Sequence, residues 1–391
     1  MATSKTGVLL QYLAILVIVI GSSFLVSTSW VQKKEVIPER QTLTIQKSMT
    51  LSEFASVNQL DEKIIRKVFE LKSKNELSRT VGSFGFDDDR ITTGIDKAKA
   101  IEAEHGSKNW QKILTKFVLW IVFLVIVFFL VKKVATSPNQ RKLLYLISTA
   151  IFGVVLGADP SAMGTVKDAV ALFAEKGVIF PPRMIALTLF LIMVVVANKL
   201  FCGWGCQFGA LQELIFRINR SKKDRRGIFK QYKLPFVFTN SFRILFFSAF
   251  CIIAFVWAID IYEYIDPFKI FKPGMIALSG WVFMAAILLS ALFVYRPWCS
   301  LFCPFGLVGW LFEKLSVFKI KVNYDTCIAC ESCARSCPST AMESILKREK
   351  TIVDCYSCST CLDACPTGSI SFSTGKRDLP PTGKYDKDKS K

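Results

Sequence analysis

The stretch that decides the fold of this 391-residue chain runs from Cys327 to Pro366: C-I-A-C-E-S-C-A-R-S-C-P (327–338), then C-Y-S-C-S-T-C-L-D-A-C-P (355–366). Each half reads C-x2-C-x2-C-x3-C-P, the spacing with which cysteine thiolates hold [4Fe–4S] clusters in bacterial two-cluster ferredoxins. The closing proline of each run ends the ligand loop, because it cannot extend a helix. We therefore expect a two-cluster ferredoxin-type α+β domain over residues 321–375.

The eight cysteines divide into two ligand sets, because the fourth cysteine of each run binds the cluster of the other run. The first set is Cys327, Cys330, Cys333 and Cys365, and the second is Cys355, Cys358, Cys361 and Cys337. Zinc is the rival metal, but its sites are usually built from separated ligand pairs. Disulfides would need an oxidising compartment, which the topology below does not predict. Two [4Fe–4S] clusters predict single-electron transfer.

The composition predicts an integral membrane protein. Hydrophobic residues make up 52% of the chain, and 33 residues are Phe, which implies several membrane spans. A net charge of +19 could indicate nucleic acid, but the basic residues cluster beside apolar segments. That placement fits the positive-inside rule, so we expect no nucleic-acid partner. The single histidine, His105, lies outside the spans, so no bis-histidine haem is expected.

Six apolar segments are expected to cross the membrane. They are residues 7–30, 117–131, 143–156, 184–200, 244–259 and 275–294. The first is interpreted as a retained anchor (1–30), because it is longer than a signal-peptide core and has no A-x-A site after it. Basic residues gather in loops 132–142 and 217–233, which predicts that these loops, both termini and the ferredoxin domain face the cytoplasm.

Residues 31–112 are predicted to form a small helical domain on the outer, periplasmic face. A capping box at Thr50–Glu53 opens one helix, and apolar stripes over 60–71 and 95–103 indicate two more. The domain could be a packed spacer or a docking site for a periplasmic partner. The polar tail, 376–391, is expected to be disordered.

The membrane core, 113–320, contains an internal repeat. Each half has an Asp-Pro loop, at Asp159 or at Asp266, followed by a span and the motif C-x3-C-x-F-G. Parallel repeats related by an axis along the membrane normal are known in membrane proteins. The repeat predicts that four cysteines lie at equal depth at the cytoplasmic interface: Cys202, Cys206, Cys299 and Cys303.

Three roles remain open for these four cysteines. They could hold a third iron–sulfur cluster or another metal, with two thiolates from each half. They could instead form redox-active thiol pairs, since nearby basic residues favour thiolate. The third reading is that they are buried, inert thiols.

Paired C-x3-C motifs ahead of two ferredoxin motifs resemble the polyferredoxin-type membrane proteins, among them NapH-like quinol dehydrogenase subunits and the membrane core of nitrous-oxide-reductase maturation regulators. The resemblance covers about residues 143–372. Cys303-Pro304 fits the membrane motif of the family, whereas Gln207 stands where proline is usual after Cys206. The resemblance implies a bacterial inner-membrane oxidoreductase subunit that exchanges electrons between the quinone pool or a cytoplasmic donor and a partner redox protein.

Two further functions stay open beside electron transfer. The chain could be a maturation factor whose membrane cysteines reduce a metal ion or a disulfide for another enzyme, or it could be a redox sensor. A quinone site would need a proton-accepting group near the interface. Asp159 and Asp266 are the candidates, although either could be a loop charge or a helix cap.

Overall fold

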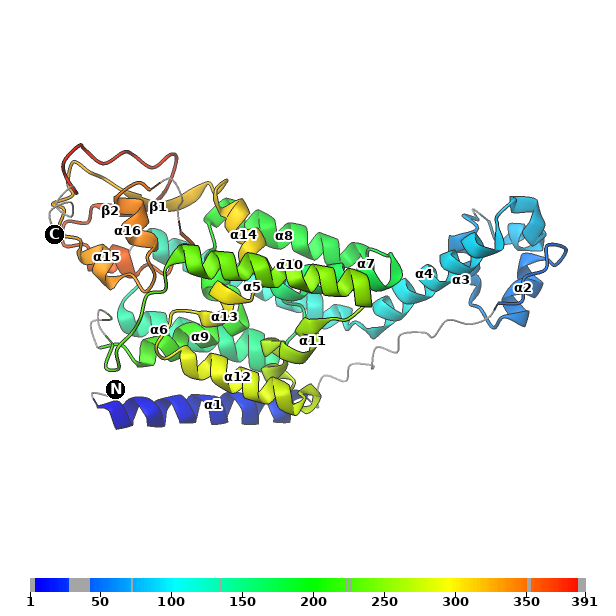
Figure 1. Ribbon diagram of the computed structural model, residues 1–391, viewed down its shortest axis with the longest axis horizontal. Coiled ribbons are helices and arrows are strands. Elements are labelled where there is room, and N and C mark those ends of the chain that lie inside the picture. The colour runs from blue at the N-terminus through cyan, green and yellow to red at the C-terminus, as the bar shows by residue number, and fades with distance from the viewer. Residues whose placement is uncertain are drawn as a thin grey trace.

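The computed structural model describes residues 4–27, 43–71, 73–133, 136–221, 224, 227–349 and 353–385. A body of helices occupies the middle of an elongated molecule (Figure 1). The C-terminal domain lies at one end, called here the proximal end, and a small helical unit lies at the other, distal end. Parts of several predicted regions fall outside the described residues, among them 28–30 of the first span, 31–42 of the outer domain, 350–352 of the ferredoxin domain and 386–391 of the tail.

Three helices of the body are long and apolar enough to cross a membrane: α1 (Lys5–Ser27), α5 (Trp110–Lys132) and α10 (Phe236–Trp257). Two shorter apolar helices, α8 (Pro181–Ala197) and α12 (Leu278–Ser290), lie at the fourth and sixth predicted spans. The third predicted span begins in α6 (Pro138–Ser148) and continues as the π-helix η3 (Thr149–Val155). The chain is therefore a mostly helical protein with membrane-type helices.

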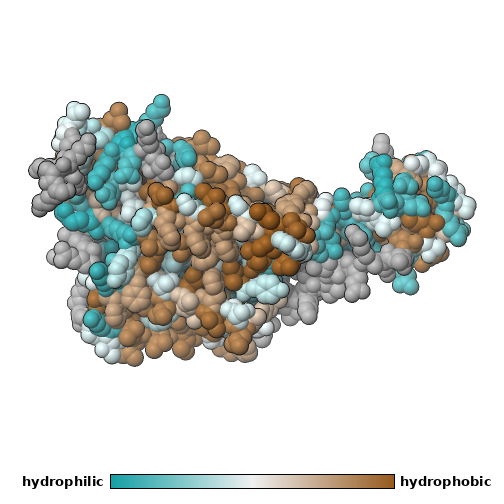
Figure 2. Space-filling model, in the orientation of Figure 1, coloured by the Kyte–Doolittle hydropathy of each residue, from teal (hydrophilic) through white to brown (hydrophobic). Residues whose placement is uncertain are grey.

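The long helices are apolar on both their inward and their outward faces. Helix α5 buries Trp120, Leu124, Val127 and Val131, an i, i+4, i+7, i+11 stripe that faces the body. Its outward face is also apolar and exposed, with Val118, Val122 and Val125 among others. Figure 2 shows apolar residues over the helical body and polar residues gathered towards its two ends. Such a surface suits lipid rather than water.

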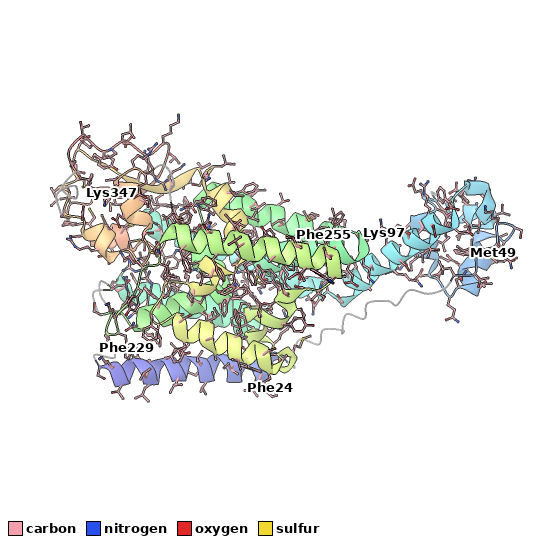
Figure 3. The ribbon with its side chains drawn as sticks, viewed as in Figure 1. Phe24, Met49, Lys97, Phe229, Phe255 and Lys347 are labelled. Atoms are coloured by element: carbon pink, nitrogen blue, oxygen red, sulfur yellow. The ribbon has the colours of Figure 1, made fainter. Side chains whose placement is uncertain are left out.

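Labelled side chains mark the direction of two of these helices (Figure 3). Phe24 near the end of α1 and Phe255 near the end of α10 both lie towards the distal end, whereas Phe229 lies at the proximal end. Both helices therefore run from the proximal to the distal end. Helix α5 runs the other way, because Lys132 at its last turn lies over the ring of Phe318 in the C-terminal domain.

Short helices fill the space between the long ones. They are α7 (Ala162–Lys176), the π-helix η4 (Phe201–Gly205), α9 (Gln207–Ile218), α11 (Ile261–Ile265), η5 (Pro267–Phe271), η6 (Pro273–Met275), α13 (Pro297–Leu301) and α14 (Pro304–Glu313). The π-helices are the irregular part of the core. Short π segments occur often at functional sites, and η4 contains Cys202.

The distal unit has a hydrophobic core of its own. Its elements are α2 (Leu51–Val57), α3 (Glu62–Val68), η1 (Lys74–Ser78), η2 (Val81–Phe84) and the start of α4 (Asp88–Ser107). The predicted capping box is present: the Thr50 hydroxyl accepts from the Glu53 amide, and the Glu53 carboxylate accepts from the Thr50 amide. Phe54, Ile65 and Ile91 are fully buried where α2, α3 and α4 meet.

The C-terminal domain has one antiparallel pair of strands, β1 (Phe318–Val322) and β2 (Ile370–Thr374), in which Val322 pairs with Ile370. Three short helices complete it: α15 (Ser332–Ser336), α16 (Ala341–Leu346) and α17 (Thr360–Ala364). One continuous hydrophobic core joins this domain to the helical body. The two parts are therefore packed together rather than tethered.

Candidate iron–sulfur centres and the buried cysteine site

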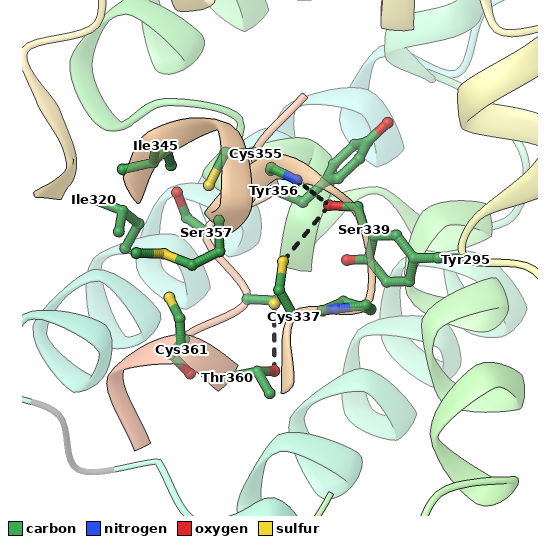
Figure 4. A pocket seen from close by; sticks show the side chains of 15 residues that line it. Tyr295, Ile320, Cys337, Ser339, Ile345, Cys355, Tyr356, Ser357, Thr360 and Cys361 are labelled. Carbon is green, nitrogen blue, oxygen red and sulfur yellow. Dashed lines mark hydrogen bonds between the residues drawn. The ribbon is translucent and has the colours of Figure 1, made fainter. Parts of the chain in front are cut away.

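The C-terminal domain encloses two cavities, and cysteine side chains line both. The first quartet is Cys327, Cys330, Cys333 and Cys365. The second quartet is Cys337, Cys355, Cys358 and Cys361 (Figure 4). The grouping is the one that the spacing predicts. Four thiolates around a small, mostly apolar space form the donor set of a [4Fe–4S] cluster, so the residues fit that cofactor, and their role as ligands stays a prediction.

Each quartet also has hydroxyl groups close to its sulfurs. The Sγ–Oγ distances are 3.5 Å for Cys330–Ser332, 3.7 Å for Cys337–Ser339, 3.4 Å for Cys358–Thr360 and 3.6 Å for Cys365–Thr367. The hydroxyl always stands two positions after the cysteine. Hydrogen bonds to cluster sulfurs tune the reduction potential. The sequence analysis missed these residues, although a fourfold C-x-S/T pattern could have revealed them.

The two quartets differ in their exposure. The side chain that follows the first cysteine of each run is 62% exposed at Ile328 but only 4% exposed at Tyr356. Within the first quartet, hydrogen bonds with Ser332 lower the pKa of Cys330 and burial raises the pKa of Cys333 to about 12, and burial likewise raises the pKa of Cys355 in the second quartet to about 12. The first quartet lies near solvent, and the second faces the helical body.

The loop Cys355–Cys358 rests directly on the segment that contains Cys202. The side-chain amide of Asn198 donates to the Cys355 carbonyl at 2.9 Å, and the indole N–H of Trp204 donates to the Ser357 carbonyl at 3.1 Å. A Cβ atom on Gly203 would lie 2.1 Å from the carbonyl oxygen of Tyr356. Only glycine allows this approach, so the second quartet and the C-x3-C segment touch through their backbones.

Buried ion pairs surround this contact. Lys199 and Arg243, which are at most 1% exposed, both bind the carboxylate of Asp354, the residue before Cys355. Arg296 binds Glu213, and both side chains are fully buried. Among the described residues around this contact, the buried cations outnumber the buried carboxylates. The six cations are Arg141, Lys199, Arg217, Arg220, Arg243 and Arg296, and the four carboxylates are Glu213, Asp224, Glu313 and Asp354.

The sequence analysis did not predict these buried ion pairs. A usable signal was present, because Lys199 and Arg296 each stand three residues before the first cysteine of a C-x3-C pair. Arg217 and Arg220, which were counted in the basic loop 217–233, are buried and bind Asp224. Residues 222, 223, 225 and 226 of that loop lie outside the described residues.

The structure brings the four cysteines of the helical body together. Cys202 lies in η4 and Cys299 in α13, while Cys206 and Cys303 precede the first turns of α9 and α14. Cys303 lies close enough to the other three cysteines for charges on their sulfurs to interact. Among the described residues, no group of three or more His, Cys, Asp or Glu side chains is placed so that it could hold a metal ion.

The two C-x3-C segments share their local geometry. Gly209 and Gly306 each follow the second cysteine by three residues, and a Cβ there would lie 2.9 Å from the Cys202 carbonyl oxygen and 2.7 Å from that of Cys299, respectively. The same carbonyls accept hydrogen bonds from Arg296, at 2.7 Å, and from Arg243, at 3.2 Å. Buried guanidinium groups therefore fix both segments.

The depth of these cysteines at the cytoplasmic interface stays a prediction, and the structure shows that the Cys206 segment contacts helix α5. The indole N–H of Trp120 donates to the carbonyl of Gly205, next to Cys206, at 2.9 Å. Trp120 stands ten residues into the 23-residue helix α5, about 15 Å along its axis at 1.5 Å per residue. The cysteine site thus lies level with the middle of α5 and not at its proximal end. The end of α8 also meets the C-terminal domain, since the Val195 carbonyl accepts from the Val317 amide at 2.7 Å.

Residues of the distal loops reach the same site from the other side. The Tyr262 hydroxyl, which comes from α11, donates to the carbonyl of Phe302 at 2.7 Å. The side-chain amide of Gln207 donates to the carbonyl of Ala158 at 2.8 Å. The four cysteines therefore lie between the second quartet on the proximal side and the loops that carry Asp159 and Asp266 on the distal side.

The two candidate quinone residues pair with different lysines. Asp159 accepts from Lys272 at 2.6 Å, and its side chain is 51% exposed. Asp266 lies 3.9 Å from Lys167, which also binds Asp260 at 3.1 Å. Asp266 also caps η5, since it accepts from the Phe268 amide. Burial raises the pKa of Asp266 to about 7, although Lys167 opposes the shift.

Comparisons with known proteins agree with this site. The family model described as "4Fe-4S binding domain" matches twice, at residues 179–226 and 276–323, each time around one C-x3-C segment. The model described as "4Fe-4S dicluster domain" matches residues 319–374. The chain is related to the polyferredoxin-type membrane electron-transport proteins.

Three relatives illustrate the range of the similarity. YccM of Escherichia coli is 28% identical over 179 residues, which is 43% of this chain and 49% of YccM. The protein NirI of Paracoccus denitrificans is 25% identical over 66% of this chain and 40% of its own length. The ferredoxin-type protein NapH of Haemophilus influenzae is 24% identical over 38% of this chain and 50% of its own length.

The chain spans about half the length of the curated relatives it matches. No solved structure matches it. The comparisons thus support an iron–sulfur electron-transfer protein with membrane helices, and they leave the individual partners to proposal.

Proposed function

We propose that the chain carries single electrons along its length through three metal centres. The two quartets would hold [4Fe–4S] clusters, and Cys202, Cys206, Cys299 and Cys303 would hold a third iron–sulfur centre. When bound, such clusters supply one-electron carriers held by thiolates. The proposal rests on the contact between the Cys355–Cys358 loop and the segment Asn198–Trp204. Through this contact the second quartet lies beside the cysteines of the helical body.

The chain itself would position and insulate the centres. Asn198 and Trp204 hold the ligand loop of the second quartet against the helical body. The excess of buried cations over buried carboxylates would offset the negative charge of thiolate-held clusters, which is costly to bury without compensation. The apolar packing around Trp298, Phe302 and Phe305 would exclude water.

The repeat and the topology are part of the same proposal. Two matches of one family model and the shared geometry at Gly209 and Gly306 support a parallel internal repeat. Six crossings, with both termini and the ferredoxin domain in the cytoplasm of a bacterium, would place the proximal end inside and residues 43–107 outside. Reporter fusions after residues 43 and 385 test this. Residue 43 should report the periplasm and residue 385 the cytoplasm, and either fusion on the other side would contradict the topology.

A quinone or a partner protein on the outer side would exchange electrons with the buried site. Asp266 is the better proton acceptor of the two candidates, because its pKa of about 7 lies near the working pH. Asp266→Asn is expected to lower quinol oxidation more than Asp159→Asn does. Equal rates in both variants and the unchanged protein would remove Asp266 from the proposal.

The decisive experiment is an anaerobic count of iron and acid-labile sulfide in the full-length protein. Three [4Fe–4S] centres require about twelve irons, and the variant with Cys202, Cys206, Cys299 and Cys303 all changed to Ala should keep about eight. Cys251→Ala, in the middle of α10, is the matched control and should match the unchanged protein. About eight irons in every sample would show that the buried cysteines are thiols, and the maturation-factor alternative would then take precedence.

A further inference from the structure

The described part of the C-terminal tail, residues 376–385, reaches the first quartet. The hydroxyl of Tyr385 lies 3.2 Å from the sulfur of Cys327, and Tyr385 lines the cavity of that quartet. Disorder of the tail, 376–391, stays a prediction, and residues 376–385 are described and contact the C-terminal domain. These contacts follow no apolar pattern in the sequence, since they are made by single aromatic and basic side chains.

Three contacts hold the tail in place. The Arg377 guanidinium donates to the carbonyl of Ile320 on β1 at 2.9 Å. The Lys384 ammonium donates to the carbonyl of Tyr324, and the rings of Tyr324 and Tyr385 lie 6.3 Å apart, edge to face. The segment from Arg377 to Tyr385 is called here the strap. It is anchored at both ends, while Leu379 between them is 72% exposed.

We propose that Tyr385 is a positioning residue for the first quartet, and that the strap shields this quartet from solvent. The inference rests on the proposed function, because it requires a cluster at the first quartet. A sulfur bound to a cluster carries no proton, so the hydroxyl would donate to it. A hydrogen bond to a cluster sulfur favours the more electron-rich, reduced state and therefore raises the reduction potential.

The second quartet has no need of a strap, because the helical body covers it. Its ligand loop lies against Asn198 and Gly203, whereas the equivalent loop of the first quartet leaves Ile328 exposed. The strap would thus give the first quartet one covered side and leave the Ile328 side as the place where a soluble donor or acceptor approaches.

The test compares Tyr385→Phe, which removes only the hydroxyl, with Leu379→Ala, which changes an exposed strap residue. Redox titration of the anaerobic full-length protein is followed by EPR, after the signal of the first quartet has been assigned with Cys330→Ser. Tyr385→Phe should lower the potential of the first quartet alone, by up to about a tenfold change in its oxidised-to-reduced ratio, or 59 mV for one electron. Leu379→Ala should leave both potentials unchanged.

Unchanged potentials in Tyr385→Phe, or equal shifts of both quartets, would overturn the role of Tyr385. A second variant that ends at Gly375 tests the shielding: it should lose iron from the first quartet faster than the full chain when a chelator is added. Equal loss rates would overturn the shielding. If the anaerobically purified protein without substitutions contained no iron, the proposed function itself would be refuted. The failure of the strap and the failure of the proposed function can therefore be told apart.

Discussion

The two cysteine quartets have the same sequence pattern and different surroundings. Both use C-x2-C-x2-C-x3-C-P, and both place residues with positive φ within the ligand loops, at Ala329 and Glu331 in one and at Ser357 and Ser359 in the other. The second quartet is buried against the helical body, while the first is covered by the strap and reaches solvent. The ligand pattern therefore sets the chemistry of each site, and the residues between the cysteines decide what each site can contact.

The largest expected effect comes from the close approach at Gly203. Gly203→Ala would put a Cβ 2.1 Å from the Tyr356 carbonyl oxygen, and backbone atoms on both sides cannot rotate away. We expect a loss of more than about 3 kcal/mol in the free energy of unfolding, or failure to assemble. Thermal unfolding in detergent and the yield of folded protein measure it.

The matched variant beside the first quartet is Gly368→Ala. Gly368 has a φ of +64° and open space around its Cβ position, so the cost should be only the left-handed strain of about 1–2 kcal/mol. Similar losses in both variants would show that the second quartet is not held by this contact.

The next effect concerns the carboxylate that joins the second quartet to the helical body. Asp354→Asn removes the nearest charged partner of the buried Lys199 and Arg243 and leaves Lys199 only Glu313, at 3.9 Å. Breaking a buried pair in this way costs about 3–5 kcal/mol. Asp363→Asn is the control, because Asp363 is 41% exposed and its pair with Arg141 should contribute about 1 kcal/mol or less. Chemical denaturation of both variants measures the difference, and equal midpoints would contradict the role of Asp354.

A smaller effect is expected in the order of iron loss. When a chelator is added to the anaerobic protein, the first quartet should release iron before the second, because only the second is enclosed by the helical body. The release of iron over time should have two phases, and the EPR signal of the first quartet should vanish in the earlier phase. A single phase, with both signals falling together, would mean that burial of the second quartet does not limit access.

Local spacing predicted which cysteines line each cavity, because these cysteines lie within short loops whose geometry depends on few residues. The contact of the Cys206 segment with α5 could not be predicted in the same way. It depends on where α8 stops and on the hydrogen bond from Trp120 to Gly205, across 85 residues of sequence. The buried role of Lys199 and Arg296 was hidden for a similar reason: a basic residue beside an apolar segment is also what the positive-inside rule predicts, and only the fold shows which ones turn inwards.

The smallest expected effect is a difference in the free energy of unfolding between variants in the cysteine loops of the two quartets. Ala329 (φ +53°) and Ser357 (φ +49°) occupy equivalent positions before the second cysteine of each run. The left-handed conformation costs a non-glycine residue about 1–2 kcal/mol, while glycine adds about 0.5–1 kcal/mol of entropy cost on folding. Ala329→Gly should therefore raise the free energy of unfolding by up to about 1 kcal/mol.

Ser357→Gly should give no such gain, although it relieves the same strain. The hydroxyl of Ser357 accepts from the Asn198 amide at 3.2 Å, and Ser357 is 1% exposed. Loss of a buried hydrogen bond costs about 0.5–1.5 kcal/mol, which offsets the relief. Thermal unfolding of the anaerobic protein compares the two variants. Equal gains would mean that the contact with Asn198 contributes nothing, and that the two quartets differ less in their loops than in the bodies around them.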